Sequence, residues 1–203
     1  LFVMTAHKFT IFDITNLNKR EKKSEMNVEL NDFSTGIILN LSPDDQTLFV
    51  RSDNAFLIID ISDHSSPIQI FRKEYTLLMS SSLAVSSDAK TLYLLATFNF
   101  AIYDLSDKKN PDLLHQEACS ANTIDLSKDD SKIVIGTLSK GFKVLDVTDP
   151  RSPTLHCSVD ASLDSLTTIA FSSEGNKILL SGSIRDSNQL YLQVFGGDRL
   201  RKK

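Results

Sequence analysis

The sequence feature that most constrains the fold is a pair of short motifs that alternate along the chain in a fixed order. The first motif runs from a phenylalanine through apolar residues to an aspartate, which is followed by an aliphatic residue, Ser or Thr, and Asp or Asn. The second is an apolar stretch, a polar turn opening on serine, and another apolar stretch. The aspartates are 47, 44 and 42 residues apart and the serines 44, 41 and 45, so one internal repeat governs the chain. The repeated residues are Phe9, Asp13, Phe56, Asp60, Phe100, Asp104, Phe142 and Asp146 in the first motif, and Ser42, Ser86, Ser127 and Ser172 in the second.

Each repeat is predicted to supply four β-strands. Apolar residues alternate with polar ones, Val, Ile, Phe and Tyr are frequent, and the intervening turns are rich in Ser, Asp and Asn. In the first complete copy we expect strands over 37–41, 47–51, 55–61 and 68–72. The third of these is apolar on both faces and must be covered on both sides. Four strands in roughly 40–45 residues are typical of a β-propeller blade.

The predicted fold class is therefore all-β, with propeller blades of four antiparallel strands and about four to five blades or part-blades. We expect one propeller domain or propeller segment over 1–203, with repeats at 1–32 (partial), 33–78, 79–119, 120–162 and 163–198 (partial). About three strands precede Phe33 and about three follow the last complete repeat. Because the resulting strand count is not a multiple of four, we expect an open arc of a larger propeller. The chain begins with Leu1 inside a strand-like pattern, which is typical of a fragment, and we expect further blades outside it or another chain over its ends.

The recurring aspartate raises the question of catalysis or folding. A carboxylate at the end of an apolar strand can be a catalytic base with a raised pKa. It can also stop the strand by accepting backbone N–H hydrogen bonds in the following loop. An enzyme does not usually need four copies of one catalytic acid, so we expect a structural role for the aspartates and a core role for the phenylalanines.

Composition and charge limit the kinds of partner, membrane segment, metal site and disulfide that the chain can have. The net charge of −4 and the scattered basic residues disfavour nucleic acid as a partner. No run of 18 apolar residues predicts a transmembrane segment. No cofactor or metal motif occurs, although His115 and His156 are predicted to fall on neighbouring fourth strands. Cys119 and Cys157 are interpreted either as two free, mostly buried thiols or as a bridge between adjacent repeats.

The chain resembles the LVIVD-repeat β-propellers at the first motif. "GFKVLDVTDPRSP" (Gly141 to Pro153) fits the family pattern nearly throughout, and "FLIIDISDHSSP" and "FAIYDLSDKKNP" fit it without the leading glycine. The first copy departs most, because "TNLNKREKK" (Thr15 to Lys23) is long, charged and lacks the proline. The resemblance implies a propeller, often on cell-surface or exported proteins and usually without assigned activity. It supplies no catalytic residue.

The leading functional hypothesis is a non-enzymatic interaction or scaffold module that presents loop faces to a protein or glycan partner. The candidate binding residues lie in loops between the second and third strands: Asn54, Asn99, Lys140, Arg185 and Asp186. The alternative is a propeller enzyme, such as a metal-dependent, lactonase-like hydrolase with a channel site, for which Asp125 is the only acid within a predicted first strand. A structural spacer in an array is a third possibility.

Overall fold

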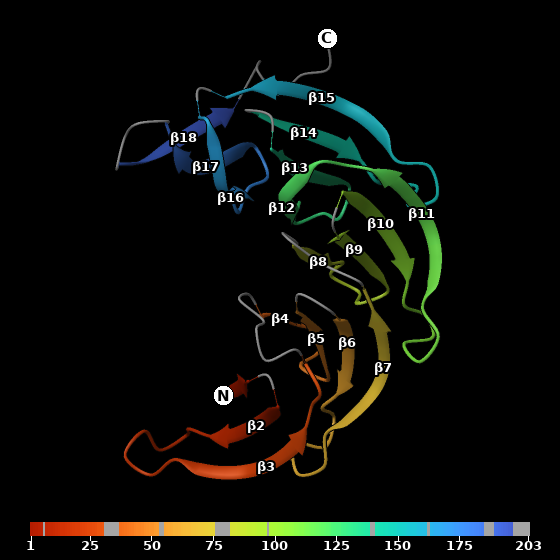
Figure 1. Cartoon of the computed structure of the whole chain (residues 1–203), viewed down its shortest axis with the longest axis vertical. Coiled ribbons are helices and arrows are strands. Elements are labelled where there is room, and N and C mark those ends of the chain that lie inside the picture. The colour runs from red at the N-terminus through yellow and green to blue at the C-terminus, as the bar shows by residue number, and fades with distance from the viewer. Residues whose placement is uncertain are drawn as a thin grey trace. The chain divides into compact units, whose positions relative to one another are not determined.

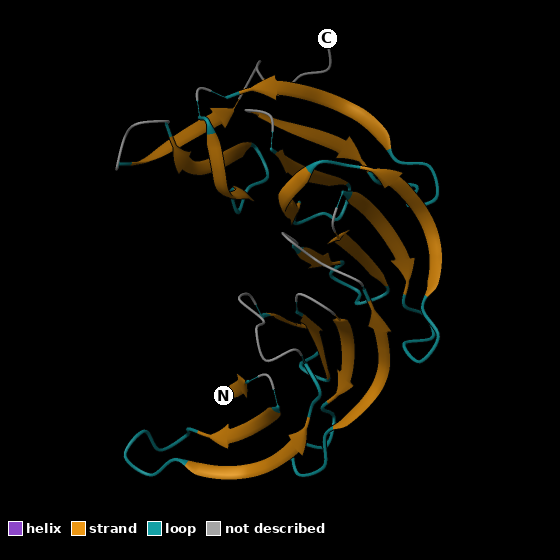
Figure 2. Cartoon of the chain, in the orientation of Figure 1, coloured by secondary structure: helices purple, strands orange, loops and turns teal. Residues whose placement is uncertain are grey.

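The structure is a computed structural model that describes residues 1–5, 7–30, 37–52, 55–75, 82–96, 98–138, 141–161, 163–184 and 189–196. These residues form eighteen β-strands joined by loops and contain no helix (Figure 2). The described part of the chain accordingly holds no helix that could cross a membrane.

The chain divides into two compact units, and each is described by itself. The first contains Leu1–Leu78 and Asp107–Asn110. It holds a three-stranded sheet in the order β1-β2-β3 and a four-stranded sheet in the order β4-β5-β6-β7 (Figure 1). The strands are β1 (Phe2–Met4), β2 (Lys8–Asp13), β3 (Glu21–Asn27), β4 (Ile38–Leu41), β5 (Thr47–Arg51), β6 (Ala55–Asp60) and β7 (Ile68–Glu74).

The second unit contains Met79–Ser106 and Pro111–Lys203. It holds three sheets, β8-β9-β10-β11, β12-β13-β14-β15 and β16-β17-β18. We number the five sheets of the chain one to five in sequence order. The strands are β8 (Leu83–Val85), β9 (Thr91–Ala96), β10 (Asn99–Asp104), β11 (Asp112–Ala118), β12 (Ala121–Leu126), β13 (Lys132–Thr137), β14 (Gly141–Asp146), β15 (Thr154–Asp160), β16 (Ser165–Phe171), β17 (Lys177–Ser183) and β18 (Leu190–Gly196).

The sheets confirm the predicted blade pattern of antiparallel strands in sequence order. Strand positions A to D are filled in sheets two, three and four, whereas β1 to β3 occupy B to D and β16 to β18 occupy A to C. Strand boundaries shift slightly in the second sheet, where the first strand starts at Ile38, the third ends at Asp60 and the fourth continues to Glu74 rather than Arg72. The fourth strand is longer than its apolar pattern because its backbone pairs with β6 beyond the last apolar side chain.

The antiparallel order gives every sheet two ends with different loops. The A–B turns, which open on the repeated serines, lie at the same end as the C–D loops, which follow the repeated aspartates; we call this the turn end. The B–C connections lie at the opposite end, which we call the tip end.

The hydrophobic core consists of clusters in which the face of one sheet packs against the face of its neighbour. In the fourth sheet Val134, Phe142 and Val144 pack against the fifth sheet, and we call these repeat positions the forward set. The opposite face of the fourth sheet packs against the third sheet, and its repeat positions are the backward set: Ile133, Ile135 and Leu145. The repeated Phe9, Phe56, Phe100 and Phe142 all belong to forward sets and are buried. Burying one such large apolar side chain stabilises a fold by about 1.5–3 kcal/mol.

Every C–D strand pair contains a β-bulge at the same place. The register shifts between Ile11 and Phe12, Ile58 and Ile59, Ile102 and Tyr103, and Val144 and Leu145. The unpaired extra residue lies on the edge strand each time. It is Lys23, Ile70, Leu114 or His156. The bulge bends the edge strand and increases its local twist.

Candidate functional site

At the turn end, each A–B turn is organised around its serine hydroxyl. In the third sheet the Ser86 hydroxyl donates a hydrogen bond to Asp88 Oδ1 at 2.6 Å and accepts one from the Thr91 backbone N–H at 2.9 Å. The same pair of bonds recurs at Ser42 and at Ser127. The Ser172 turn differs, since its hydroxyl bonds to Asn176 instead of an acid two residues on. The hydroxyl therefore fixes the turn through one donated and one accepted hydrogen bond.

The residue three positions after each serine has left-handed backbone geometry. Its φ is 56° at Asp45, 58° at Ala89, 57° at Asp130 and 67° at Gly175. Only glycine adopts this conformation without cost, and an ordinary L-residue pays roughly 1–2 kcal/mol. Three of the four turns therefore hold a strained residue, with Ala89 the least suited because it lacks the short polar side chain of aspartate.

The C–D loops answer the question raised by the repeated aspartates. Asp60 Oδ1 accepts hydrogen bonds from the Ser62 backbone N–H at 2.9 Å and from its hydroxyl at 2.7 Å. Asp63 then repeats the pattern one turn further on with the Ser65 N–H. Equivalent backbone bonds are made by Asp13, Asp104 and Asp146, and by Asn16, Asp107 and Asp149. The first copy makes the same two turns although Arg20 stands where the other copies have proline.

These hydrogen bonds determine the charge state of the turn end. The Ser127 and Ser131 hydrogen bonds lower the pKa of Asp129 to about 2, and those from Thr15 lower the pKa of Asp13 to about 2. The pKa values of Asp60, Asp104 and Asp146 are lowered by the same kind of bond. A general acid–base group works best with a pKa near the operating pH. These five carboxylates are instead held ionised and weakly basic.

Two clefts open between neighbouring turns of the second unit. One, of about 290 Å³, lies between the Ser86 and Ser127 turns, which Ser87 joins by hydrogen bonds to Asp130. It is lined in part by Tyr93, whose pKa is raised to about 12 by burial and by the nearby Asp130 and Asp88, so the phenol stays neutral. The other cleft, of about 440 Å³, lies between the Ser127 and Ser172 turns. Both are lined mainly by residues of the turns and loops of this end.

Asp125, the acid singled out for a channel site, lies on β12 as predicted. Its Oδ2 accepts a hydrogen bond from the Phe171 backbone N–H of β16 at 2.7 Å. Burial raises the pKa of Asp125, and the N–H bonds from Phe171 and Leu126 oppose this. The carboxylate thus links the first strands of the fourth and fifth sheets. In the described ranges no three His, Cys, Asp or Glu side chains lie together as a metal group.

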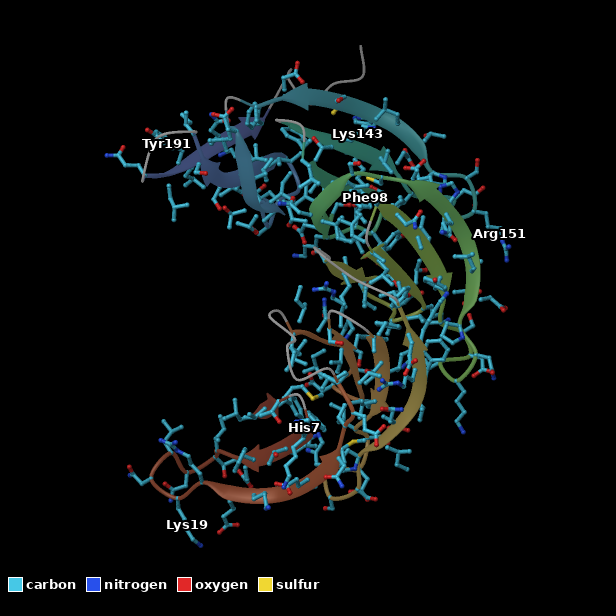
Figure 3. The ribbon with its side chains drawn as sticks, viewed as in Figure 1. His7, Lys19, Phe98, Lys143, Arg151 and Tyr191 are labelled. Carbon is cyan, nitrogen blue, oxygen red and sulfur yellow. The ribbon has the colours of Figure 1, made fainter. Side chains whose placement is uncertain are left out.

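The tip end of the second unit presents a different surface. Strands β9 and β10 are joined by two residues, and the second of them, Phe98, has a φ of 60° with 62% of its surface exposed. A left-handed conformation in a bulky residue is a genuine backbone outlier. Unlike the strained residues of the turn end, this one carries a large aromatic ring, and the ring is largely exposed. Phe98 is labelled in Figure 3.

A second exposed apolar residue is tied to the same segment. The Cys119 backbone N–H donates to the Phe98 carbonyl at 2.8 Å, and the Leu138 N–H donates to the carbonyl of the adjacent Ser120 at 3.0 Å. Leu138 is 51% exposed. The segment between the third and fourth sheets therefore holds both tips in place. We call these residues the Phe98–Leu138 surface: Phe98, Cys119, Ser120 and Leu138.

The thiol of this surface is not activated. Burial raises the pKa of Cys119, with Lys143 opposing the shift and Glu117 adding to it. Cys119 packs beside the core formed by the third and fourth sheets. Cys119 and Cys157 are both free, which rules out the bridge alternative. Cys119 therefore contributes packing at this surface.

The structure places the other predicted residues as follows. Asn99 begins β10 next to Phe98, where its backbone pairs with Ala96 and Ala118. Asn54, Lys140, Arg185 and Asp186 lie outside the described residues. His115 is on β11 and His156 on β15, as predicted, and His115 Nε2 lies 3.8 Å from Glu117 Oε2. The sequence analysis did not predict a role for Phe98 and chose its neighbour Asn99. Position 98 holds neither glycine nor asparagine, the residues that usually indicate a left-handed backbone.

The repeat pattern can now be compared with known proteins. The family model of the LVIVD repeat matches residues 48–74 and 134–161. This chain carries LVIVD repeats. Each matched LVIVD repeat spans most or all of strand B, strand C, the aspartate loop and strand D, so each match contains the double turn described above. No curated protein matches the chain.

Solved structures show that the LVIVD repeats of this chain form a β-propeller fold. A candidate 6-phosphogluconolactonase from Bacteroides fragilis matches with a TM-score of 0.66 at 16% identity, over 97% of this chain and 62% of that one. The Myceliophteria thermophila Cps50 (Swd1) β-propeller domain matches with a TM-score of 0.66 at 12% identity, over 96% and 67%. A chain of the S. cerevisiae assembly of Dbp5 with Nup159 and Gle1 matches with a TM-score of 0.67 at 12% identity, over 98% and 55%. The chain thus spans between 55% and 67% of the length of these structures.

Proposed function

We propose that this chain is a non-enzymatic interaction module that binds a protein partner through the Phe98–Leu138 surface. The observation that carries the proposal is the exposed Phe98 ring on a left-handed backbone. Strained residues persist only where the surrounding structure over-determines them, and they cluster at functional sites. A side chain that is 62% exposed gains little from intramolecular packing that would offset this strain.

The composition of the surface favours a protein over a glycan. Aromatic residues dominate the energetic centres of protein interfaces, where neighbouring apolar contacts exclude water around them. Phe98 supplies such an anchor and Leu138 an apolar neighbour on the next sheet. The hydrogen bonds from Cys119 and to Ser120 hold the two tips to one segment, so the anchor would lose little conformational freedom on binding.

The non-enzymatic part of the proposal is supported by the charge states at the turn end. The repeated aspartates have lowered pKa values and are engaged by their own loops. Asp125, whose pKa is raised, has its carboxylate bonded to the backbone of the next sheet. The similarity to a candidate lactonase is at the level of fold, and a shared fold does not transfer an activity. The yeast similarity comes from a protein assembly, which fits an interaction role.

The experiment replaces Phe98 with a photo-crosslinking phenylalanine analogue and compares it with the same analogue at Leu155, an exposed position on β15. We expect one protein to crosslink at position 98 and not at 155. The variant Phe98→Gly should lose this partner while unfolding at the same or a higher temperature, because glycine relieves the left-handed strain. Equal crosslinking at both positions, or an unchanged partner in Phe98→Gly, would reject the proposal.

A further inference from the structure

Tyr93 places a polar group at a repeat position that is apolar in the other copies. The strand registers make it equivalent to Phe2, Phe49, Val134 and Leu179. Tyr93 therefore belongs to the forward set of the third sheet, and its ring packs in the core shared with the fourth sheet. Because Phe49 fills the same position without a hydroxyl, packing alone does not account for the hydroxyl of Tyr93.

The Tyr93 hydroxyl is buried beside a cleft and has no protein partner in the described ranges. Tyr93 is 2% exposed and lines the cleft of about 290 Å³ between the Ser86 and Ser127 turns. Its hydroxyl forms no hydrogen bond to a described residue, although Asp88 and Asp130 lie near enough to raise the pKa of the phenol. Buried polar groups are normally hydrogen-bonded, so this hydroxyl is available to a bound group.

Three aspartates that line the same cleft each use one carboxylate oxygen in the turns. Hydrogen bonds from other described residues reach only Oδ1 of Asp88, Oδ1 of Asp129 and Oδ2 of Asp130. These bonds lower the pKa of Asp88 and bring the pKa of Asp129 to about 2, so both carboxylates are ionised at neutral pH. The second oxygen of each carboxylate can accept a hydrogen bond from a bound group.

The lining of the cleft favours a cation with an aliphatic chain. Its described residues include three aspartates and no lysine, arginine or histidine, and Lys90 and Lys132 lie near two of these aspartates without lining the cleft. No three acidic side chains of the described ranges lie together as a metal group, so the carboxylates border the cleft instead of converging on one point. Val147 and Pro150 add apolar surface beside them.

The neighbouring cleft of about 440 Å³ lacks this arrangement, although it occupies the equivalent place between the next two turns. Its described lining combines Lys128 and Lys132 with Asp129 and Glu174, so the charges balance, and it includes no tyrosine. The excess of negative charge and the buried hydroxyl therefore belong to one cleft and are not a general property of the repeat.

We propose that the cleft between the Ser86 and Ser127 turns binds an alkyl cation that carries N–H donors. The side chains of arginine and lysine and the free polyamines all contain such a group. The Tyr93 hydroxyl and the second oxygens of the three aspartates accept its hydrogen bonds, and Val147 and Pro150 contact its aliphatic chain. Hydrogen bonds between ionised groups are about twice as strong as neutral ones. The cleft lies at the turn end, so this inference is independent of the Phe98–Leu138 surface.

Titration of the isotope-labelled full chain with butylguanidinium chloride, followed by the backbone amide resonances, tests the proposal. We expect saturable shifts at Lys90 and Ser131, whose N–H groups bond to Asp88 and Asp129 beside the cleft. Tetramethylammonium has the same charge but no N–H group, so it should bind at least about tenfold more weakly. Absence of saturable shifts at these amides, or equal binding of tetramethylammonium, would overturn the proposal.

Two variants assign the binding to this cleft. Tyr93→Phe removes only the hydroxyl, and we expect it to weaken butylguanidinium binding by at least about tenfold, because a hydrogen bond to a charged group is lost. Asp130→Asn should weaken binding by up to about fivefold, and asparagine tolerates the left-handed backbone at this position. The matched controls are Tyr103→Phe on β10 and Glu174→Gln in the neighbouring cleft, and both should bind like the wild type.

Unchanged circular dichroism and melting temperature identify the variants that are folded. Wild-type affinity in both folded Tyr93→Phe and folded Asp130→Asn, or an equal loss in Tyr103→Phe, would overturn the proposal. Calcium chloride that moves the same resonances when butylguanidinium does not would also overturn it in favour of a metal site. Spermidine and N-acetyl-arginine methylamide distinguish the sources of the cation, because the natural source should bind more tightly than butylguanidinium.

Discussion

The turn end and the tip end of the sheets use their side chains in opposite ways. At the turn end, serines and aspartates bond to their own loops, and four copies do so with nearly the same geometry. At the tip end of the second unit, Phe98 and Leu138 each leave more than half of an apolar side chain exposed. The difference teaches that repetition marks folding requirements, whereas a candidate binding surface lies where the copies diverge.

The strongest test of this comparison removes a turn serine. Ser42 is buried, and Ser42→Ala leaves the Thr47 N–H and Asp44 without their partner. We expect a loss of about 1–3 kcal/mol in the free energy of unfolding, measured by urea denaturation. Leu138→Ala at the tip end should cost no more than about 0.5 kcal/mol. Equal losses in the two variants would contradict the division between the ends.

Ser172→Ala refines the same test. Its turn is more exposed, and its hydroxyl bonds Asn176 instead of an acid. We expect a smaller loss than for Ser42→Ala. A loss as large as that at Ser42 would mean that the acid two residues on contributes little to the turn.

A smaller effect is expected from the left-handed turn positions. Ala89→Gly should raise the free energy of unfolding by up to about 1 kcal/mol, because glycine adopts a φ of 58° without steric cost. The reverse change, Gly175→Ala, should lower it by a similar amount, since nothing but backbone strain opposes the added methyl group there. Thermal melts of both variants check the pair, and a destabilised Ala89→Gly would show that the methyl group matters more than the strain.

The smallest effect concerns pH. The pKa of Asp129 is lowered to about 2 from an ordinary value of 3.8 by hydrogen bonds to its carboxylate. A folded-state pKa below the unfolded one means that the contribution to stability is present above about pH 4 and is lost as the pH falls toward 2. The melting temperature of Asp129→Asn should therefore fall less than that of the wild type as the pH is lowered over this range. If the melting temperatures of the two proteins fell equally with pH, the Asp129 carboxylate would not be held by these hydrogen bonds.

Much of the fold could be predicted from the sequence because the repeated residues form hydrogen bonds with near neighbours in the sequence. The serine that opens each turn and the aspartate that ends four of the five C strands act on residues within a few positions of themselves. Apolar alternation then sets the strands between them. The β-bulges could not be predicted, since one extra residue such as Leu114 on an edge strand leaves no mark in the apolar pattern.

The candidate site was only partly predictable for the same reason. The B–C connections were recognised as loops, and Asn99 was chosen as a polar candidate. Phe98 is left-handed because only two residues connect β9 and β10, which is a property of the paired strands and not of the phenylalanine. The cleft beside Tyr93 is equally non-local, because its lining residues come from two neighbouring sheets that meet only in the fold.

The bulge near the start of β3, β7, β11 and β15 has a consequence for aggregation. These are edge strands, and a straight edge invites pairing with another chain, whereas a bulged and twisted one resists it. β18 is an edge of the fifth sheet, and its pairing with β17 runs through seven residues without a register shift (Figure 1). The bulges thus protect four edges against fibril-like stacking. The edge at β18 has seven paired residues and no bulge, and we expect it to be one of the edges where such stacking begins in chains that are stored, concentrated or heated.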